Sequence, residues 1–348
     1  MPAIREIPAD RFAFGCHRFG FGPAPGGGPV DVERHVVPMV KAALDLGIRT
    51  FDSAVLYRAT LQLGRALEIL GVDPRSIRFQ TKCLRYLGLA IDGAVEHQPD
   101  ALLQGIPARY QGLTDHWDPS ARGVEQQICR ERIEFGGGSL YGVALHDSPD
   151  MEKQIGLTWE TGVRPAVRYL QSAKDGGFVE RIGLGIKDPA FVHRFIAEEP
   201  GTLDYAGLTF CPAILGPLMN IIEAAQQGPH FEVTLMGINY GQAFTLTQDP
   251  ASAPDFLFNY EVATVAERAL MSRFFNICGS LPLLHLAAAV AGLLVVNFPN
   301  IMTQIVTSTM TPNRLNETVK LIREVQVPAP VWRELKAAGL IPHRFPTS

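Results

Sequence analysis

The sequence predicts a single α/β domain, residues 1–348, folded as a closed (β/α)8 barrel (TIM barrel), and three observations support this. Eight strand-like segments alternate with helix-like segments, and strands in such an order pair as parallel βαβ units. The strand-like segments are almost continuously apolar, which is typical of parallel strands buried on both faces. No G-x-G-x-x-G motif follows the first predicted strand, which disfavours the alternative, an open doubly wound sheet. Eight such units in one chain therefore indicate one barrel and one domain.

Each strand prediction rests on a short apolar run, and each helix prediction rests on apolar residues that recur at a helical period. In the first long helix, Val36, Val40 and Ala43 share one face, and Gly47 stands where a C-terminal capping glycine belongs. The predicted strands cover residues 11–15, 48–51, 77–81, 140–145, 182–186, 205–210, 232–238 and 304–307. The predicted helices cover residues 32–46, 61–70, 122–132, 161–174, 189–196, 218–226, 260–275, 287–294 and 313–325.

One segment breaks this alternation. Residues 84–121, after the third predicted strand, are polar and show no clear period. A long irregular connection inside a compact domain is usually functional or disordered. We therefore predict a long loop after strand three.

Composition narrows the class of protein. Hydrophobic residues make up 47% and charged residues 19%, which is enough apolar material for a large core. The formal net charge of -4 gives no electrostatic reason to expect nucleic acid or an anionic membrane as a partner. The five cysteines contain no C-x-x-C pair, which argues against a disulfide scaffold or a zinc ribbon and fits a reducing compartment, so we expect a cytoplasmic protein. No spacing of His, Asp and Glu supports a metal site, and we predict none.

Two stretches bear on targeting and membranes. The N-terminal residues carry charges where the apolar core of a secretory signal would lie. Residues 274–313 contain no Asp, Glu, Lys or Arg. That stretch is interrupted by Pro282 and by the break at residues 297–299, whereas a membrane-spanning helix needs about 20 consecutive apolar residues. We interpret it as a buried helix, a turn and a buried strand.

Polar residues follow three neighbouring strands of the predicted barrel. Asp52 follows the second strand and Tyr57 lies in the same loop. Lys82 follows the third strand and His146 the fourth. The active sites of such barrels lie at the C-terminal ends of the strands, where the βα loops converge. We therefore expect these four side chains to meet at the mouth of the barrel.

This set of side chains suits proton transfer to oxygen. Tyrosine has an ordinary pKa of about 10 and is a poor proton donor at neutral pH. A nearby lysine cation lowers that pKa, and an aspartate beside the lysine holds it in place. A histidine within hydrogen-bonding distance can orient a carbonyl oxygen. Together such groups can protonate an alkoxide as hydride reaches the carbon, or run that reaction backward.

The motifs that contain these residues resemble the aldo-keto reductases. The segments are GIRTFDSAVLY followed by LGRAL, then FQTK and VALHD. The resemblance implies that Tyr57 is the acid/base, that Lys82 adjusts its pKa, that Asp52 holds Lys82 and that His146 orients the carbonyl. The C-terminal segment VPAPVWRELKAAGLI is similar to the tail of the branch that contains D-threo-aldose dehydrogenase and pyridoxal 4-dehydrogenase.

The resemblance also implies a nicotinamide cofactor, NAD or NADP, although two positions depart from the family pattern. Lys187 stands where the family has an asparagine that holds the nicotinamide carboxamide. Met310, in TSTMTPNR, stands where an arginine grips the 2'-phosphate of NADP, which favours NAD. A helix N-terminus can still hold a pyrophosphate with backbone N–H groups and hydroxyls. The predicted cofactor-binding residues are Lys187, Tyr240, Gly241, Gln242, Ser308, Thr309, Met310, Arg314 and Glu317.

The partner we expect is a small-molecule substrate, selected by loops at the same rim. The predicted substrate-binding residues are His17, Phe19, Leu56, Arg85, Tyr86 and Trp117. Aromatic and apolar side chains together with an arginine suit a medium-sized polar-aromatic or sugar-like compound. Taken with the family resemblance, the substrates we expect are sugar-like, pyridoxal-like or natural-product carbonyl compounds.

Two alternatives to an oxidoreductase stay open, because one barrel hosts many chemistries. Lys187 and Met310 favour a redox-neutral isomerase or dehydratase that uses Tyr57 and Lys82 for proton transfer next to a carbonyl. The third possibility is a binding or sensor protein. The sequence carries no signal of an oligomeric state.

Overall fold

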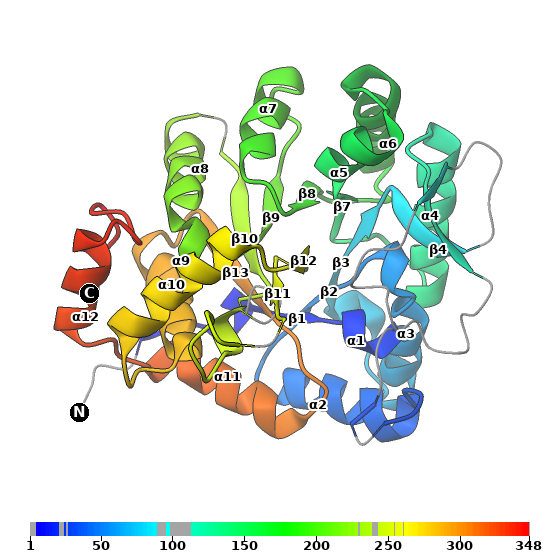
Figure 1. Cartoon of the computed structure of the whole chain (residues 1–348). Coiled ribbons are helices and arrows are strands. Elements are labelled where there is room, and N and C mark those ends of the chain that lie inside the picture. Colours follow the sequence, from blue (N-terminus) through cyan, green and yellow to red (C-terminus); the bar gives the residue numbers. More distant parts are fainter. Residues whose placement is uncertain are drawn as a thin grey trace.

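Eight parallel strands close into a barrel, as the sequence predicts (Figure 1). The structure, a computed structural model, describes residues 5–20, 24–25, 27–88, 95–97, 113–228, 230–238, 243–253, 255–259 and 261–347. The barrel strands are β1 (Phe12–Gly15), β2 (Thr50–Asp52), β3 (Arg78–Cys83), β7 (Gly142–His146), β8 (Ile182–Ile186), β9 (Tyr205–Thr209), β10 (Glu232–Met236) and β13 (Met302–Thr307). The predicted fold class is therefore confirmed.

The register of the barrel brings the ends of its first four strands together. Gly15 of β1 lies opposite Asp52 of β2, and Asp52 lies opposite Gln80 of β3. Lys82 of β3 lies opposite Ala144 of β7, two residues before the end of that strand at His146. The side chains predicted to share a site thus come from adjacent strands at one end of the barrel.

Helices surround the strands (Figure 1). The predicted helices are present as α2 (Val37–Asp45), α3 (Thr60–Ile69), α4 (Ala121–Phe135), α6 (Arg164–Asp175), α7 (Ala190–Glu198), α8 (Leu215–Gln227), α9 (Val265–Cys278), α10 (Leu283–Asn297) and α11 (Pro312–Glu324). Within the described residues, three α-helices were not predicted: α1 (His17–Gly20), α5 (Ser148–Ile155) and α12 (Ala329–Ala337).

The start of α9 differs from the prediction by several residues. A short hairpin of β11 (Leu257–Phe258) and β12 (Glu261–Val262) precedes it. Thr264 then caps the helix: its hydroxyl accepts from the backbone of Glu267, whose carboxylate accepts from the backbone of Thr264. This reciprocal pair satisfies free N–H groups at the helix start and fixes the boundary there.

The apolar stretch forms the buried helix α10 followed by β13, as predicted. No single helix of the described chain has the length and apolar composition needed to cross a membrane; α9 and α10 meet both criteria only as a pair, and the pair is bent by 88°.

The segment after β3 is not wholly irregular, which corrects the prediction of a long loop. It contains a three-stranded antiparallel sheet in the order β4 (Arg85–Gly88), β6 (Thr114–Trp117), β5 (Val95–His97). Only Leu84 separates β3 from β4, and it adopts a positive φ of 87°, which redirects the chain. The buried side chain of Gln127 accepts from the backbone N–H of Leu84 at 2.9 Å and satisfies this turn.

Two glycines of the barrel strand β8 leave room for long side chains from other strands. A Cβ atom on Gly183 of β8 would lie 2.3 Å from the ring of Tyr205, its partner on β9. A Cβ atom on Gly185 would lie 2.8 Å from Cδ of Lys82. Both distances are shorter than real contacts allow. The small residues of β8 are therefore what permits Lys82 and Tyr205 to lie inside the barrel.

A buried carboxyl ties the outer layer to β3. Glu131 of α4 is 1% exposed, and its Oε2 atom accepts from the hydroxyls of Thr60 at 2.8 Å and Thr81 at 2.6 Å. Burial raises the pKa of Glu131 to about 7, while the two hydroxyl donors act in the opposite direction. The folded protein therefore binds this proton more tightly than the unfolded chain does.

We predict that Glu131 makes folding stability fall with rising pH. Between its ordinary pKa of 4.5 and the folded value of about 7, the folded state holds the proton that the unfolded state has lost, so the free energy of unfolding decreases across that window. The full loss is on the order of 3 kcal/mol. In urea unfolding at pH 5 and pH 8, Glu131→Gln should remove this part of the pH dependence. Equal pH dependence in the variant and the original protein would contradict the prediction.

Candidate active site

A cavity of about 330 Å³ opens at the C-terminal ends of the barrel strands. All four residues predicted to carry the chemistry line it, namely Asp52, Tyr57, Lys82 and His146. Its other lining residues are Gly15, His17, Arg18, Leu56, Asp147, Gly185, Ile186, Lys187, Thr209, Met236, Gly237, Ile238, Leu284, Val306, Thr307, Ser308 and Thr318.

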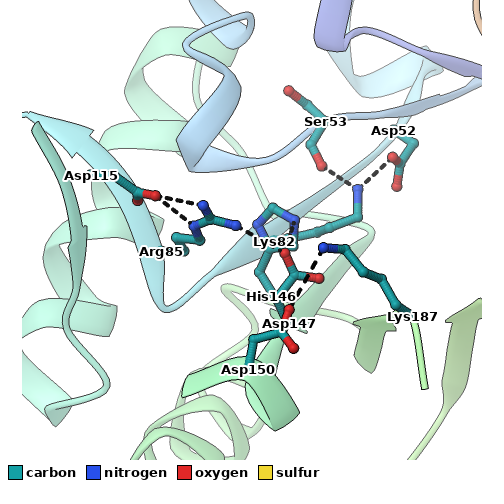
Figure 2. A network of polar contacts seen from close by, with 9 residues as sticks. All are labelled: Asp52, Ser53, Lys82, Arg85, Asp115, His146, Asp147, Asp150 and Lys187. Carbon is teal, nitrogen blue, oxygen red and sulfur yellow. Dashed lines mark hydrogen bonds and ion pairs between the residues drawn. The ribbon is translucent and has the colours of Figure 1, made fainter. Parts of the chain in front are cut away.

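Lys82 and Asp52 form a buried ion pair in the wall of this cavity (Figure 2). The Lys82 ammonium donates to Asp52 Oδ1 at 2.5 Å and to the backbone carbonyl of Ser53 at 2.7 Å. Gln80 donates to the second carboxylate oxygen of Asp52 at 3.2 Å. Burial raises the pKa of Asp52, and the contacts with Lys82 and Gln80 oppose that rise. The lysine is thus fixed in position and direction.

Tyr57 lies at the end of a single 3-10 turn, Val55–Tyr57, and its ring is placed between the other groups. The Lys82 ammonium is 5.5 Å from the centroid of that ring. The His146 ring meets it edge-on, with centroids 5.7 Å apart at 86°. A Cβ atom on Gly20 would lie 1.7 Å from the backbone carbonyl oxygen of Tyr57, so only glycine allows α1 to support this turn so closely. The structure therefore brings together the four residues predicted for proton transfer.

His17 completes the ring of polar groups. Its ring centroid lies 6.0 Å from that of Tyr57, and its Nδ1 atom lies 3.2 Å from the hydroxyl of Ser308. Burial lowers the pKa of His17 to about 4, and the charges of Arg18 and Lys82 add to this effect. His17 is therefore neutral at pH 7, and its ring can both donate and accept a hydrogen bond.

A second group of charges, formed by Arg85, Asp115 and Asp147, lies beside His146 (Figure 2). The sequence reasoning named only Arg85 of these three, as a substrate-binding residue. Arg85 donates to Asp115 Oδ2 through two nitrogens at 2.6 and 2.9 Å, and to Asp147 Oδ2 at 3.2 Å. The same oxygen of Asp147 is 3.7 Å from Nε2 of His146. The sequence could have indicated Asp147, because it directly follows His146 in the motif VALHD.

Four of the six residues predicted to bind substrate do not belong to the described cavity lining. His17 and Leu56 line the cavity. Arg85 and Trp117 are buried in and beside the three-stranded sheet, with the guanidinium 5.6 Å from the centroid of the indole. Tyr86 stacks on His116, and Phe19 stacks on Phe14. None of Phe19, Arg85, Tyr86 and Trp117 belongs to the described cavity lining.

The residues predicted to bind the cofactor fall into three groups. Lys187 and Ser308 line the cavity, and Lys187 pairs with Asp150 at 3.7 Å. Thr309, Met310, Arg314 and Glu317 follow β13, in or just before α11, without lining the cavity as described. Tyr240, Gly241 and Gln242 lie outside the described residues.

The start of α11 offers hydrogen-bond donors. Thr311 precedes this helix, and its side chain makes no capping bond. Its buried hydroxyl has no hydrogen-bond partner among the residues that the structure describes. A helix N-terminus with free N–H groups and an unused hydroxyl suits an anionic group such as a phosphate. In the described chain, no group of three or more His, Cys, Asp or Glu side chains could hold a metal ion.

Comparisons place this fold among known structures. No family model and no curated protein matches the sequence. The holo form of the aldo-keto reductase AKR11C1 from Bacillus halodurans superposes with a TM-score of 0.65 at 14% sequence identity, over 99% of each chain. The glycerol dehydrogenase AKR11B4 from Gluconobacter oxydans gives 0.62 at 16% identity, over 100% of this chain and 96% of its own. At such low identity these likenesses show that the chain shares the barrel fold of these enzymes.

We predict that the Lys82–Asp52 pair is strongly coupled. Either single variant, Lys82→Met or Asp52→Asn, leaves one buried charge without its partner and should cost about 3 kcal/mol of unfolding free energy. The double variant should be at least about 2 kcal/mol more stable than the sum of the single effects implies, as read from urea unfolding curves.

The exposed pair Lys41–Asp45, 2.7 Å apart with both side chains 62% exposed, is the matched control. Its coupling should be about 0.5 kcal/mol or less. If the effects of Lys82→Met and Asp52→Asn on the free energy of unfolding were additive, the prediction of strong coupling would be wrong.

Proposed function

We propose that this protein is a nicotinamide-dependent oxidoreductase that interconverts a carbonyl group and an alcohol. The observation that carries the proposal is the convergence of Asp52, Tyr57, Lys82 and His146 on one cavity at the C-terminal ends of the barrel strands. The shared fold of AKR11C1 and AKR11B4 supports it. We further propose that the chain belongs to the aldo-keto reductases, in the branch indicated by its C-terminal segment.

In the proposed reaction, Tyr57 moves the proton. As the carbonyl carbon accepts hydride, the developing charge on oxygen takes the proton of the Tyr57 hydroxyl, and alcohol oxidation reverses both transfers. The Lys82 ammonium stabilises the phenolate left behind, because an opposite charge nearby favours the ionised form. Asp52 fixes the ammonium, and His146 orients the carbonyl oxygen. When bound, the nicotinamide would supply or accept the hydride.

The residues around the cavity fit such a cofactor. Lys187 and Ser308 line the cavity and would contact it on two sides. The unused hydroxyl of Thr311 and the N-terminus of α11 would hold its pyrophosphate. Met310 supplies no cation for a 2'-phosphate, which favours NAD over NADP. For the substrate we propose a sugar-like, pyridoxal-like or natural-product carbonyl compound.

One observation favours a second candidate function, a redox-neutral isomerase or dehydratase. Lys187 stands at the position where the resemblance calls for an asparagine, lines the cavity and pairs with Asp150 at 3.7 Å. A second ammonium lining the same cavity as Lys82 could take part in proton transfer beside a carbonyl without any hydride step.

Titration with reduced cofactors separates the two candidates. We predict that NADH binds in the sub-millimolar range and more tightly than NADPH, as measured by cofactor fluorescence. Lys187→Asn, which introduces the residue expected from the resemblance, should strengthen NADH binding. Absence of binding at millimolar NADH and NADPH would support the redox-neutral candidate.

Tyr57→Phe tests the proton-transfer role. Loss of the hydroxyl should lower kcat roughly 100- to 10,000-fold, as is typical of a general acid, while the affinity for NADH changes little. The measurement is cofactor absorbance with a panel of sugars, pyridoxal-like aldehydes and natural-product carbonyl compounds.

Tyr169→Phe is the control, since Tyr169 lies on α6 and does not belong to the described cavity lining. It should keep full turnover. Full turnover in Tyr57→Phe would show that the acid/base assignment is wrong.

A further inference from the structure

Arg18 is an exposed cation in the lining of the cavity that contains Tyr57. Its guanidinium forms no hydrogen bond and no ion pair with any residue that the structure describes. The other charged residues of the described lining each have an oppositely charged group within ion-pair distance; they are Asp52, Lys82, Asp147 and Lys187. In this part of the chain, Arg18 is therefore the lining cation that remains open to an anion from solution.

The backbone of α1 holds Arg18 in a fixed place. Phe19 is fully buried, and its ring stacks on Phe14 with centroids 5.4 Å apart. Gly20 packs so closely against Tyr57 that a Cβ atom there would lie 1.7 Å from the carbonyl oxygen of Tyr57. Two of the four residues of α1 are thus anchored in the core. Arg18 is therefore positioned beside the Tyr57 turn, while its own side chain stays accessible to solvent.

The charge of Arg18 acts on the surroundings of Tyr57. Burial lowers the pKa of His17 to about 4, and the charge of Arg18 is the next largest cause of that lowering. The centroid of the His17 ring is 6.0 Å from that of Tyr57. Since His17 is neutral at pH 7, it adds no second positive charge beside Arg18. An anion bound by Arg18 would lie in the same cavity as the Tyr57 side chain.

The structure also changes which arginine is available to a substrate. Arg85, which the sequence predicts to bind substrate, is 2% exposed and donates to two carboxylates, those of Asp115 and Asp147. Arg85 does not belong to the described cavity lining, whereas Arg18 does. The guanidinium expected at the substrate rim is therefore supplied by α1 and not by β4.

We propose that Arg18 binds an anionic group of the substrate, a carboxylate or a phosphate, while the reacting carbonyl group of the same molecule lies at Tyr57. The inference rests on the proposed function and narrows its substrate class to compounds that carry a negative charge. A planar guanidinium can donate two parallel hydrogen bonds to either group, which fixes the orientation of the bound molecule. Because the Arg18 side chain is exposed, the anion keeps part of its hydration and avoids the full cost of burying a charge.

Two matched pairs of aldehydes test the proposal. They are para-carboxybenzaldehyde with its methyl ester, and glyceraldehyde 3-phosphate with glyceraldehyde. The charged member of at least one pair should have a kcat/KM at least about tenfold above that of the neutral member, as read from cofactor absorbance. The pair that shows the preference distinguishes a carboxylate from a phosphate. If neither charged member is preferred, the proposal is overturned.

Variants of Arg18 show whether the preference comes from this side chain. Arg18→Gln should lower the charged-to-neutral ratio of kcat/KM roughly 10- to 100-fold, through KM and not through kcat. Arg18→Lys keeps the charge without the paired donors and should retain part of the ratio. Raising NaCl from about 50 to about 500 mM should reduce the ratio in the original protein, because salt screens exposed charges.

Arg333→Gln is the matched control. Arg333 is an exposed arginine on α12 and does not belong to the described cavity lining. This variant should keep the ratio of the original protein. If Arg18→Gln keeps that ratio as well, Arg18 does not bind the anion and the proposal is overturned.

A titration with NADH separates the substrate from the cofactor as the source of the anion. Arg18→Gln should weaken NADH binding far less than it lowers the charged-to-neutral ratio. An equal loss of NADH affinity would show that Arg18 binds the cofactor pyrophosphate, and it would overturn the assignment to the substrate.

A binding measurement without turnover distinguishes this inference from the proposed function. The probes are the alcohols para-(hydroxymethyl)benzoate and glycerol 3-phosphate, titrated into the cofactor-free full-length protein by calorimetry. If no aldehyde is turned over but one of these anions binds and Arg18→Gln weakens its binding, the oxidoreductase proposal fails and the role of Arg18 stands. If turnover is found without a preference for charge, the role of Arg18 fails alone.

Discussion

Lys82 and Asp52 form an ion pair in the barrel wall with almost no access to solvent, and the other groups around the cavity are arranged against it. Moving two such charges out of water costs several kcal/mol per ion, and their attraction offsets this only when the geometry is good. The backbone carbonyl of Ser53 and the amide of Gln80 supply the remaining hydrogen bonds. Because stability alone rarely favours a buried pair over apolar residues, its presence is better explained by the chemistry proposed for Tyr57.

The three-stranded sheet after β3 belongs to this electrostatic arrangement as well. It places Arg85 on β4 opposite Trp117 on β6, with Asp115 on the same strand as Trp117. The Arg85 guanidinium therefore contacts the Asp115 carboxylate and the Trp117 ring as well as Asp147. A buried arginine of this small sheet thus contacts a carboxylate of the cavity lining, which gives the sheet more than a covering role.

The sequence was sufficient for the barrel because its eight strands are short apolar runs with helices between them, and a closed parallel sheet is the fold that such an order favours. The proximity of Asp52, Lys82 and His146 could be predicted from the same strand order, because the C-terminal ends of parallel strands lie at the same end of the barrel. The small sheet was missed because its strands are polar and pair locally in antiparallel register. The contact of Asp147 with Arg85 was not predicted because it depends on the positive φ of Asp147. The burial of Arg85 was not predicted because long side chains can bury their stems and still expose their charged ends.

The glycines of β8 have a consequence for redesigning the protein. Gly183 and Gly185 have no side chains, and the space beside them inside the barrel is occupied by Tyr205 from β9 and Lys82 from β3. Larger residues on β8 would therefore push out Tyr205 or Lys82 before they could touch any ligand. To alter substrate preference, it would be better to vary cavity-lining residues outside the barrel strands, for instance Leu56 or Leu284, and to leave the glycines of β8 unchanged.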